Sequence, residues 1–196
     1  MPTRADAPIA SPRRAGRPRS QEADVAILDA ALALLTAEGY ARMTMDAVAA
    51  AAGVSKATIY LRYRSKADLA TAALAHLRDT AGPEPTGDLR ADLVALLRQM
   101  RRNTARFRVM PLIGTCLAEE QHTPELLPLF RERSVLPRRE RLAAMLEAAG
   151  GDPRQVAAAV DMLIGAFHMR SLAGDPFPTD WEERVVEVDL AGLGLG

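Results

Sequence analysis

The chain has 196 residues, of which 48% are hydrophobic, 4% aromatic and 26% charged, and its formal net charge is zero. Alanine and leucine dominate the hydrophobic residues and favour helices, so we expect an all-α protein. The single cysteine, Cys116, excludes an internal disulfide and a multi-cysteine metal site. The N-terminus lacks the apolar core of a secretory signal, and no run approaches the roughly 18–20 apolar residues of a membrane span. We therefore expect a cytoplasmic protein with no membrane partner.

Charge is distributed unevenly along the chain. Residues 1–80 carry 11 lysines and arginines against 8 acidic residues, whereas residues 81–196 carry 14 against 17. Within residues 1–20 the count is 5 against 1. A basic front half joined to an acidic back half suggests a polyanion partner for the front half only.

The front of the chain begins with a basic segment and a first helix. Residues 1–19 are rich in proline, alanine and arginine, so we expect a disordered basic arm. Ser20 is the predicted N-cap of a helix that ends at Gly39, which adopts the left-handed conformation readily. The apolar stripe of this helix is Val25, Leu28, Leu32 and Leu35.

Two short helices separated by a glycine come next. Thr44 is the predicted cap of a helix over 45–52, and Gly53 breaks that helix. Ser55 then caps a third helix, which we expect to run to about Arg64. The helix, turn and helix together have the form of a helix-turn-helix, whose second helix enters the DNA major groove.

A fourth helix and a linker follow. Ser65, with Asp68 three residues later, resembles a capping box and predicts a helix over 66–80. The segment 81–87, AGPEPTG, has two prolines and two glycines in seven residues and reads as a linker.

The predicted organisation is therefore two all-α domains, over residues 20–81 and 82–196. The second domain is expected to contain a long helix over 89–107, a short segment around 111–120, a long segment from about 123 to 150 that prolines 128 and 137 interrupt, a helix over 153–173 and a last helix over about 179–190.

The helix expected over 153–173 is apolar on two sides. One side carries Val156, Val160, Leu163, Ile164 and Phe167, and Met162, Ala166 and Met169 continue the apolar surface, leaving a narrow polar strip at Asp161 and His168. An arc much wider than the ~100° of a surface helix indicates burial on two sides. We expect another subunit to cover the second side.

The outward residues of the third helix suit DNA recognition. Lys56 is expected to donate to guanine O6 and N7, and the methyl group of Ala57 suits a thymine methyl. Thr58 and Tyr60 offer hydroxyl groups to phosphate oxygens. Tyr63 is instead expected to pack inward beside Ile59, four residues away.

Two further residues are expected to contact phosphates. Thr44, at a helix N-terminus, places a hydroxyl and free amides where a phosphate can lie. Lys66, in the first turn of the fourth helix, is expected to pair with a phosphate as a point charge.

The segment TMDAVAAAAGVSKATIYLRYRSKADL resembles the DNA-binding signature of the TetR family of transcriptional repressors. The shared positions are Thr44, Ala52, Gly53, Val54, Ser55, Thr58, Ile59, Tyr60, Tyr63 and Lys66. The resemblance implies a three-helix DNA-binding domain, a homodimer on a palindromic double-stranded DNA operator, and a divergent C-terminal domain that binds a small-molecule effector and dimerises.

The resemblance also implies roles for particular residues. Lys56, Ala57, Thr58, Tyr60 and Leu61 lie where members of the family contact DNA, and Thr44 and Lys66 lie where members contact phosphate. Leu61 departs from the polar or larger aromatic residue that members often carry. DMLIGAFHMRSLAGDPF resembles the penultimate helix of one branch of the family, which forms the dimer interface and here would use Met162, Ala166 and Met169.

The basic arm has two interpretations, a DNA minor-groove contact and a tail that only improves solubility. Its Gly-Arg-Pro core suits a narrow A·T-rich minor groove, where Arg17 and Arg19 would meet enhanced negative potential. The plain alternative is a solubilising tail. The position of the arm, just before a helix-turn-helix, favours the groove.

Candidate pocket residues are apolar or adaptable side chains of the second domain, together with one histidine: Met100, Phe107, Cys116, Met145, Met162, Phe167 and His168. A small core residue is the plainer interpretation of Cys116, and a core or interface residue that of His168. The histidines lack metal spacing, and no catalytic arrangement stands out, so we expect no metal, no cofactor and no enzymatic activity. The alternative function is a non-specific architectural DNA-binding protein, which the acidic second half argues against.

Overall fold

The computed structural model describes residues 17–80, 83–107 and 109–195, and the regular structure in these ranges is entirely helical. The all-α class predicted from composition is confirmed. The N-terminal elements are α1 (Arg17–Glu38), α2 (Met45–Ala52), α3 (Lys56–Tyr60) and α4 (Lys66–Thr80). The C-terminal elements are α5 (Leu89–Phe107), α6 (Val109–Ala118), the 3-10 turn η1 (Glu119–Gln121), α7 (Leu126–Phe130), the π-helical turn η2 (Arg131–Val135), α8 (Leu136–Ala148), α9 (Pro153–Ala173) and α10 (Trp181–Gly192).

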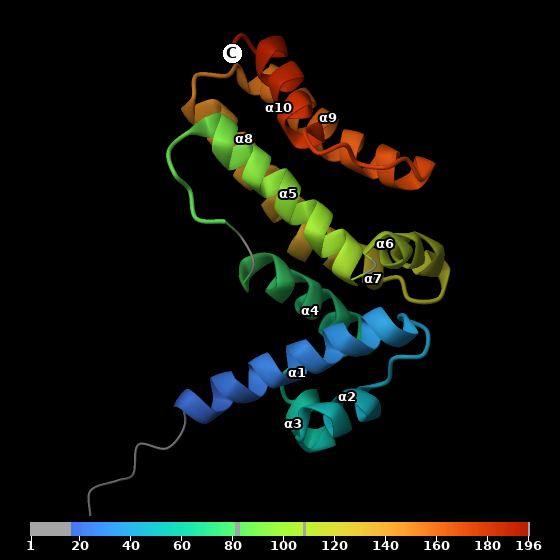
Figure 1. Cartoon of the computed structure of the whole chain (residues 1–196). Coiled ribbons are helices and arrows are strands. Elements are labelled where there is room, and N and C mark those ends of the chain that lie inside the picture. Colours follow the sequence, from blue (N-terminus) through green and yellow to red (C-terminus); the bar gives the residue numbers. More distant parts are fainter. Residues whose placement is uncertain (1–16, 81–82, 108, 196) are drawn as a thin grey trace, which may run out of the picture.

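The helices form an elongated molecule in which α4 lies between the two halves (Figure 1). Helices α2 and α3 are at one end, below α1, and α9 and α10 are at the other. A shift of α4 would therefore change how the helix-turn-helix is positioned relative to the C-terminal helices.

Helix α1 begins at Arg17, four residues earlier than an N-cap at Ser20 predicts, and residues 17–19 belong to the helix rather than to the arm. Its core face also differs from the predicted stripe: Val25 is 41% exposed, whereas Ile27 is fully buried. Helices α2 and α4 both pack against α1, and the side on which they pack decides which apolar residues are covered. Gly39 ends the helix with a φ of 80°, as predicted.

Local caps shape the helix-turn-helix as predicted. The hydroxyl of Thr44 accepts the N–H of Ala47 at 3.1 Å, and the hydroxyl of Ser55 accepts the N–H of Thr58 at 3.1 Å. Between the two helices Gly53 has a φ of 66°, a conformation that side chains with a Cβ rarely adopt. The angle between α2 and α3 therefore rests on contacts within 15 residues of sequence.

Helix α3 ends at Tyr60, so the predicted end at about Arg64 is wrong. The N–H of Arg64 donates to Oδ2 of Asp68 at 2.7 Å, and the N–H of Asp68 donates to the hydroxyl of Ser65 at 3.1 Å. Asp68 thus accepts from Arg64 rather than from Ser65, which departs from a reciprocal capping box. These contacts hold residues 64 and 65 in the turn before α4, and α3 therefore does not continue to Arg64.

The segment from 123 to 150 is divided near its prolines, as predicted. Helix α7 contains Pro128, and the π-helical turn η2 directly precedes α8, which carries Pro137 in its first turn. Proline has no N–H, and its ring clashes with the carbonyl four residues earlier, so a wider turn before Pro137 relieves both problems.

Two clusters of buried hydrophobic residues hold the described chain together. The first joins α1–α4 to four residues of α6 and α7: Leu112, Cys116, Leu126 and Phe130. The second joins α5, α8, α9 and α10. The boundary between the clusters therefore lies within the C-terminal half rather than at the linker.

Helix α9 corrects the expectation that no segment is long and apolar enough to cross a membrane, because by length and composition α9 is. Its buried residues Val156, Leu163 and Phe167 pack within the second cluster. Packing in a protein core accounts for the apolar character of that side.

Candidate nucleic-acid interface and ligand cavity

Helix α3 presents the predicted DNA-reading residues to solvent. Lys56 and Ala57 are exposed, Tyr60 is 50% exposed and Leu61 is 84% exposed. Ile59 is fully buried beneath them. The helix therefore has an outward face available to a partner and an inward face fixed by the core.

Tyr63 packs against the first cluster, as predicted, rather than facing outward. Next to it, Arg62 forms an ion pair with Asp24 of α1 at 2.5 Å and donates to the carbonyl of Thr58 at 3.1 Å. The end of α3 is thus tied to α1, which fixes the direction in which α3 points.

Lys56 has a partner that the sequence did not reveal. Its Nζ lies 2.7 Å from Oδ1 and 2.9 Å from Oδ2 of Asp46 in α2. The hydrogen bond and the charge of Asp46 raise the pKa of Lys56 above its usual value. Lys56 must therefore exchange or share this carboxylate when it donates to another acceptor.

Thr44 and Thr58 differ in how available their hydroxyls are. Thr44 is exposed and accepts only the capping N–H, which leaves its hydroxyl hydrogen for a phosphate. Oγ1 of Thr58 lies 2.8 Å from Oγ of Ser55 and is half-buried. Thr44 is the better placed of the two for a phosphate contact.

Lys66 secures the turn between α1 and α2. Its Nζ donates to the carbonyl of Tyr40 at 2.9 Å and to that of Ala41 at 3.3 Å, and it lies 4.3 Å from the centre of the Tyr40 ring. An ammonium group has three N–H donors, so one remains for a phosphate. Lys66 therefore has a structural role, and its phosphate contact stays a prediction.

The predicted minor-groove contacts of Arg17 and Arg19 lie outside the described side chains. The backbone of both residues forms the start of α1, and residues 1–16 are outside the described ranges. A contact from either arginine stays a prediction.

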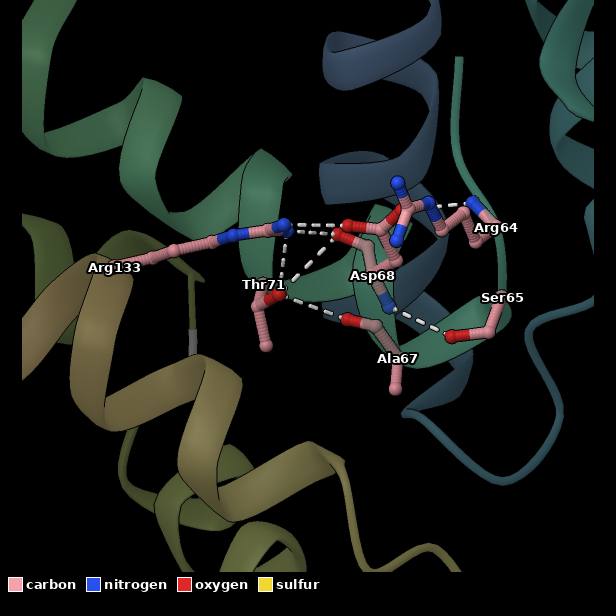
Figure 2. Close-up of polar contacts among 6 residues, drawn as sticks. All are labelled: Arg64, Ser65, Ala67, Asp68, Thr71 and Arg133. Carbon is pink, nitrogen blue, oxygen red and sulfur yellow. Dashed lines mark hydrogen bonds and ion pairs between the residues drawn. The ribbon is translucent and has the colours of Figure 1, made fainter. Parts of the chain in front are cut away.

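Arg133 of η2 joins the C-terminal half to the first turn of α4 (Figure 2). Its Nη1 donates to the carbonyl of Asp68 at 2.7 Å and to the hydroxyl of Thr71 at 3.0 Å, while Nη2 pairs with Oδ1 of Asp68 at 2.6 Å. The other oxygen of Asp68 accepts the N–H of Arg64. One carboxylate thus connects the end of the helix-turn-helix, the start of α4 and η2.

A cavity of about 160 Å³ lies beside this junction. Its apolar lining comes from Leu74 and Leu77 of α4 together with Met100, Ile113, Phe130, Val135 and Ile164. Its polar lining comes from Asn103, Thr104, Ser134, Arg138 and His168. A largely apolar cavity with a few polar groups is the usual form of a small-molecule site.

The structure places two of the predicted pocket residues, Met100 and His168, in the wall of this cavity. The other five lie outside this wall, and a ligand contact from any of them stays a prediction. Phe107 and Cys116 pack with the first cluster, Phe167 is buried in the second, Met145 packs against the second and Met162 is 56% exposed. Leu74, Leu77 and Arg138 line the cavity and were missed, because sequence spacing does not show which helices meet there.

Cys116 is a buried residue of the first cluster, with 1% of its surface exposed. Burial raises the pKa of its thiol to about 11, so the thiolate is scarce at neutral pH and the group is unreactive. Within the described residues, no group of three or more His, Cys, Asp and Glu side chains is arranged to hold a metal ion.

The α9–α10 face, which we define by Met162, Ala166, Met169 and Val188, is an apolar surface at the end of the molecule far from α3. Met162, Met169 and Val188 are 56%, 67% and 73% exposed. A groove in this face is lined by Met162, Ala166 and Val188, together with the buried residue Asp189. Both flanks of α9 are thus apolar, as predicted, but only one is covered within a single chain.

Replacing Asp189 with asparagine is expected to stabilise the protein at pH 7.5 by up to about 3 kcal/mol. Asp189 is 3% exposed, its carboxylate has no hydrogen-bond partner among the described residues, and burial raises its pKa from 3.8 to about 6. Because the folded chain holds this proton more tightly, stability is highest below pH 3.8 and falls as the pH rises towards and through 6.

Urea unfolding of both proteins at pH 5 and pH 7.5 measures this effect. The advantage of D189N should be smaller at pH 5 by roughly 1 kcal/mol. The same change at exposed Asp175 should alter stability by less than about 0.5 kcal/mol. A wild type that is more stable than D189N at pH 7.5 would mean that Asp189 has a partner across the α9–α10 face.

Two family models match successive parts of the chain. The model of bacterial regulatory proteins of the tetR family matches residues 27–73, and the model of the tetracyclin repressor-like C-terminal domain matches residues 83–188. The first match covers the helix-turn-helix, and the second covers the cavity wall from Met100 to His168 and the α9–α10 face.

Curated relatives give the same assignment. An uncharacterised HTH-type transcriptional regulator of Mycobacterium tuberculosis is 35% identical over 159 residues, which are 78% of each chain. The DNA-binding transcriptional repressor TetR of Mycobacteroides abscessus is 43% identical over 86 residues, covering 43% of this chain and 45% of that protein.

Solved structures share the fold over most of its length. The TetR family transcription regulator SCO0332 is 31% identical, with a TM-score of 0.70 over 87% of this chain and 98% of that one. The flavonoid-responsive regulator FrrA is 25% identical, with a TM-score of 0.61 over 87% and 94%. Together with the two matched models, these similarities show that the chain belongs to the TetR family of helix-turn-helix transcriptional regulators.

Proposed function

We propose that this protein is a repressor that binds a palindromic operator as a homodimer and leaves it when a small molecule occupies the cavity. The observation that carries the proposal is the position of α4. Leu74 and Leu77 in its second half line the cavity, while in its first turn Lys66 holds the turn that leads into α2 and Asp68 holds the segment that follows α3. A ligand in the cavity therefore touches the helix that supports the DNA-reading unit.

DNA recognition is assigned to the exposed face of α3. In this proposal Lys56 and Ala57 read base edges in the major groove, and Tyr60 contacts a phosphate. Thr44 and Lys66 add phosphate contacts from neighbouring helix starts. Leu61, Thr58, Arg17 and Arg19 complete the proposed contact set; the two arginines would lie in the adjacent minor groove.

Dimerisation is assigned to the α9–α10 face. Its three large exposed apolar side chains are unusual for a surface meant to stay in water. A two-fold dimer through this face would hold two copies of α3 at a fixed spacing, and successive major grooves on one side of DNA are about 34 Å apart. A palindromic operator matches such a two-fold arrangement.

The release step follows from the contact between η2 and α4. Ser134 and Val135 of η2 line the cavity, and Arg133 beside them holds Asp68 of α4. A ligand that favours one position of η2 therefore favours one position of α4, and the spacing of the two α3 helices changes. The names of two similar proteins, a repressor and a flavonoid-responsive regulator, support release of this kind.

The test is selection of bound fragments from genomic DNA with the full chain, followed by footprinting and measurement of affinity against salt. We expect one palindromic sequence bound at least ~1,000-fold more tightly than bulk DNA. Equal binding to all sequences would instead identify an architectural protein.

Lys56→Ala is expected to change which base the operator prefers at one position of each half-site, with discrimination reduced by about 1–3 kcal/mol. Tyr60→Phe should weaken binding to all operator variants equally, by about 1 kcal/mol, because it removes one phosphate contact. Fluorescence anisotropy on a panel of single-base operator variants measures both. Lys56→Arg, which keeps the charge, is the matched control. Uniform weakening by Lys56→Ala would reassign Lys56 to a phosphate.

A further inference from the structure

The polar part of the cavity is built from basic groups and hydrogen-bond donors. Arg138 of α8 and His168 of α9 both line it, and the described residues of its wall include no aspartate or glutamate. Burial and the nearby Arg138 guanidinium lower the pKa of His168, so its imidazole is neutral at pH 7. Arg138 is therefore the side chain among the described residues of the wall that stays charged at pH 7, and a guanidinium has five N–H donors for acceptors around it.

Ser134 supplies a second, independent sign of a polar ligand. Its residue is only 5% exposed, and its hydroxyl has no hydrogen-bond partner among the described residues, although it lines the cavity. Asn103 lies in the same wall, and its amide oxygen already accepts from Gln99 at 2.7 Å. The NH₂ group of Asn103 is thus the part of the side chain that would donate a hydrogen bond to a ligand. Arg138, Ser134 and Asn103 come from three different helical elements and offer N–H or O–H groups to one oxygen-bearing ligand.

The remaining wall limits the size of the ligand. The cavity measures about 160 Å³, and a cavity of about 150 Å³ in another protein holds one benzene molecule. Pockets for drug-sized ligands measure roughly 300–1,000 Å³. The apolar side, with Leu74, Leu77 and Ile113, suits one ring or a short alkyl chain, and a three-ring flavonoid exceeds this volume.

We propose that the cavity binds a small monocarboxylate, with its carboxylate at Arg138 and Ser134 and a single ring or short chain against Leu74 and Leu77. A neutral ring would leave the Ser134 hydroxyl without an acceptor, whereas a carboxylate accepts both from this hydroxyl and from N–H groups of the Arg138 guanidinium. We further infer that this carboxylate is the effector that releases DNA, and this part of the inference rests on the proposed function. The binding site itself is inferred from the residues that line the cavity, independently of the proposed function.

The test is calorimetric titration of the full chain at pH 7.5 with three probes: benzoate, its neutral isostere benzamide, and the larger 2-naphthoate. We expect benzoate to bind at least ~10-fold more tightly than either of the others, since benzamide lacks the charge and 2-naphthoate exceeds the volume. Benzamide binding as tightly as benzoate, or no binding of benzoate, would overturn the proposal.

Variants locate the carboxylate. Arg138→Gln should weaken benzoate binding at least ~10-fold and change benzamide binding by less than ~3-fold. Arg141→Gln, an exposed position on the same helix, should change neither. If R138Q does not fold, as judged by circular dichroism, Ser134→Ala takes its place, with a ~3-fold or greater loss of benzoate binding expected. An unchanged benzoate-to-benzamide ratio in a folded variant would overturn the assignment.

A parallel measurement of operator binding separates this inference from the proposed function. Benzoate that binds without releasing the operator would support the carboxylate site and overturn its role as effector site. Operator recognition that is intact in a protein that does not bind benzoate would overturn the site and leave DNA recognition untouched.

Discussion

Met169→Glu is expected to leave the chain monomeric and to weaken operator binding by more than about 100-fold. Met169 is 67% exposed on the α9–α10 face, and in a two-fold dimer each copy would place the new carboxylate in an apolar contact. Burying an unpaired charge is strongly unfavourable, so the subunits separate. A monomer contacts one half-site and loses the gain that comes from linking two binding modules.

Sedimentation and operator anisotropy measure the two parts of this result. Leu117→Glu is the matched control, because Leu117 is 58% exposed on α6 and is not one of the residues of the α9–α10 face. That variant should remain dimeric and bind the operator like the wild type. If the Met169 variant remains dimeric and the Leu117 variant does not, the interface lies on the other side of the molecule.

Arg133→Met is expected to lower the free energy of unfolding by about 2 kcal/mol. The change removes the charged partner of Oδ1 of Asp68, and only Oδ2, which accepts the N–H of Arg64, keeps its hydrogen bond. The side chain of Asp68 is 15% exposed and that of Arg133 is 31% exposed, so water replaces the lost contacts only in part. Methionine keeps the length of the stem and therefore its packing. Urea unfolding checks the value.

Two comparisons assign the loss to this contact. Arg131→Met changes an exposed residue of the same turn and should alter stability by less than about 0.5 kcal/mol. A double-mutant cycle with Asp68→Asn should give a coupling energy of about 1–3 kcal/mol between the two positions. Additive effects would mean that Arg133 stabilises the chain through something other than Asp68.

The same variant addresses release of DNA. Allosteric coupling between two sites is typically 5–150-fold in affinity, and the R133M protein should retain only about 3-fold or less. Ligand binding itself should change little, because Arg133 is not part of the cavity wall. Full release by ligand in R133M would place the transmission elsewhere, for example directly through Leu74 and Leu77 of α4.

Short-range features of this protein were predictable from its residues. Thr44, Gly53 and Ser55 shape the helix-turn-helix because a cap or a left-handed glycine acts within three or four residues. The same locality explains why the starts of α2, α3 and α4 agree with prediction. The end of α3 does not agree, since it depends on Asp68 in the next helix capturing the N–H of Arg64.

Longer-range features needed the folded chain. The Asp46–Lys56 pair, the Lys66 contacts to the α1–α2 turn and the Arg133–Asp68 contact join positions 10 to 65 residues apart. Sequence spacing assigns each of these residues to one face of its own helix, but it does not show which other helix or turn packs against that face. The two lysines therefore looked like free DNA ligands, although each already holds a partner.

The pattern of α9 shows the same division. Its periodicity indicated two apolar sides, because apolar residues at helical spacing must be covered by something. It did not show that Phe167 enters the core, that His168 meets Arg138 across a cavity, or that Met162 and Met169 remain in solvent. Helix type and amphipathic faces follow from local residue order, whereas the cavity and its charge arise where α4, α5, α8 and α9 come together, and only packing brings them there.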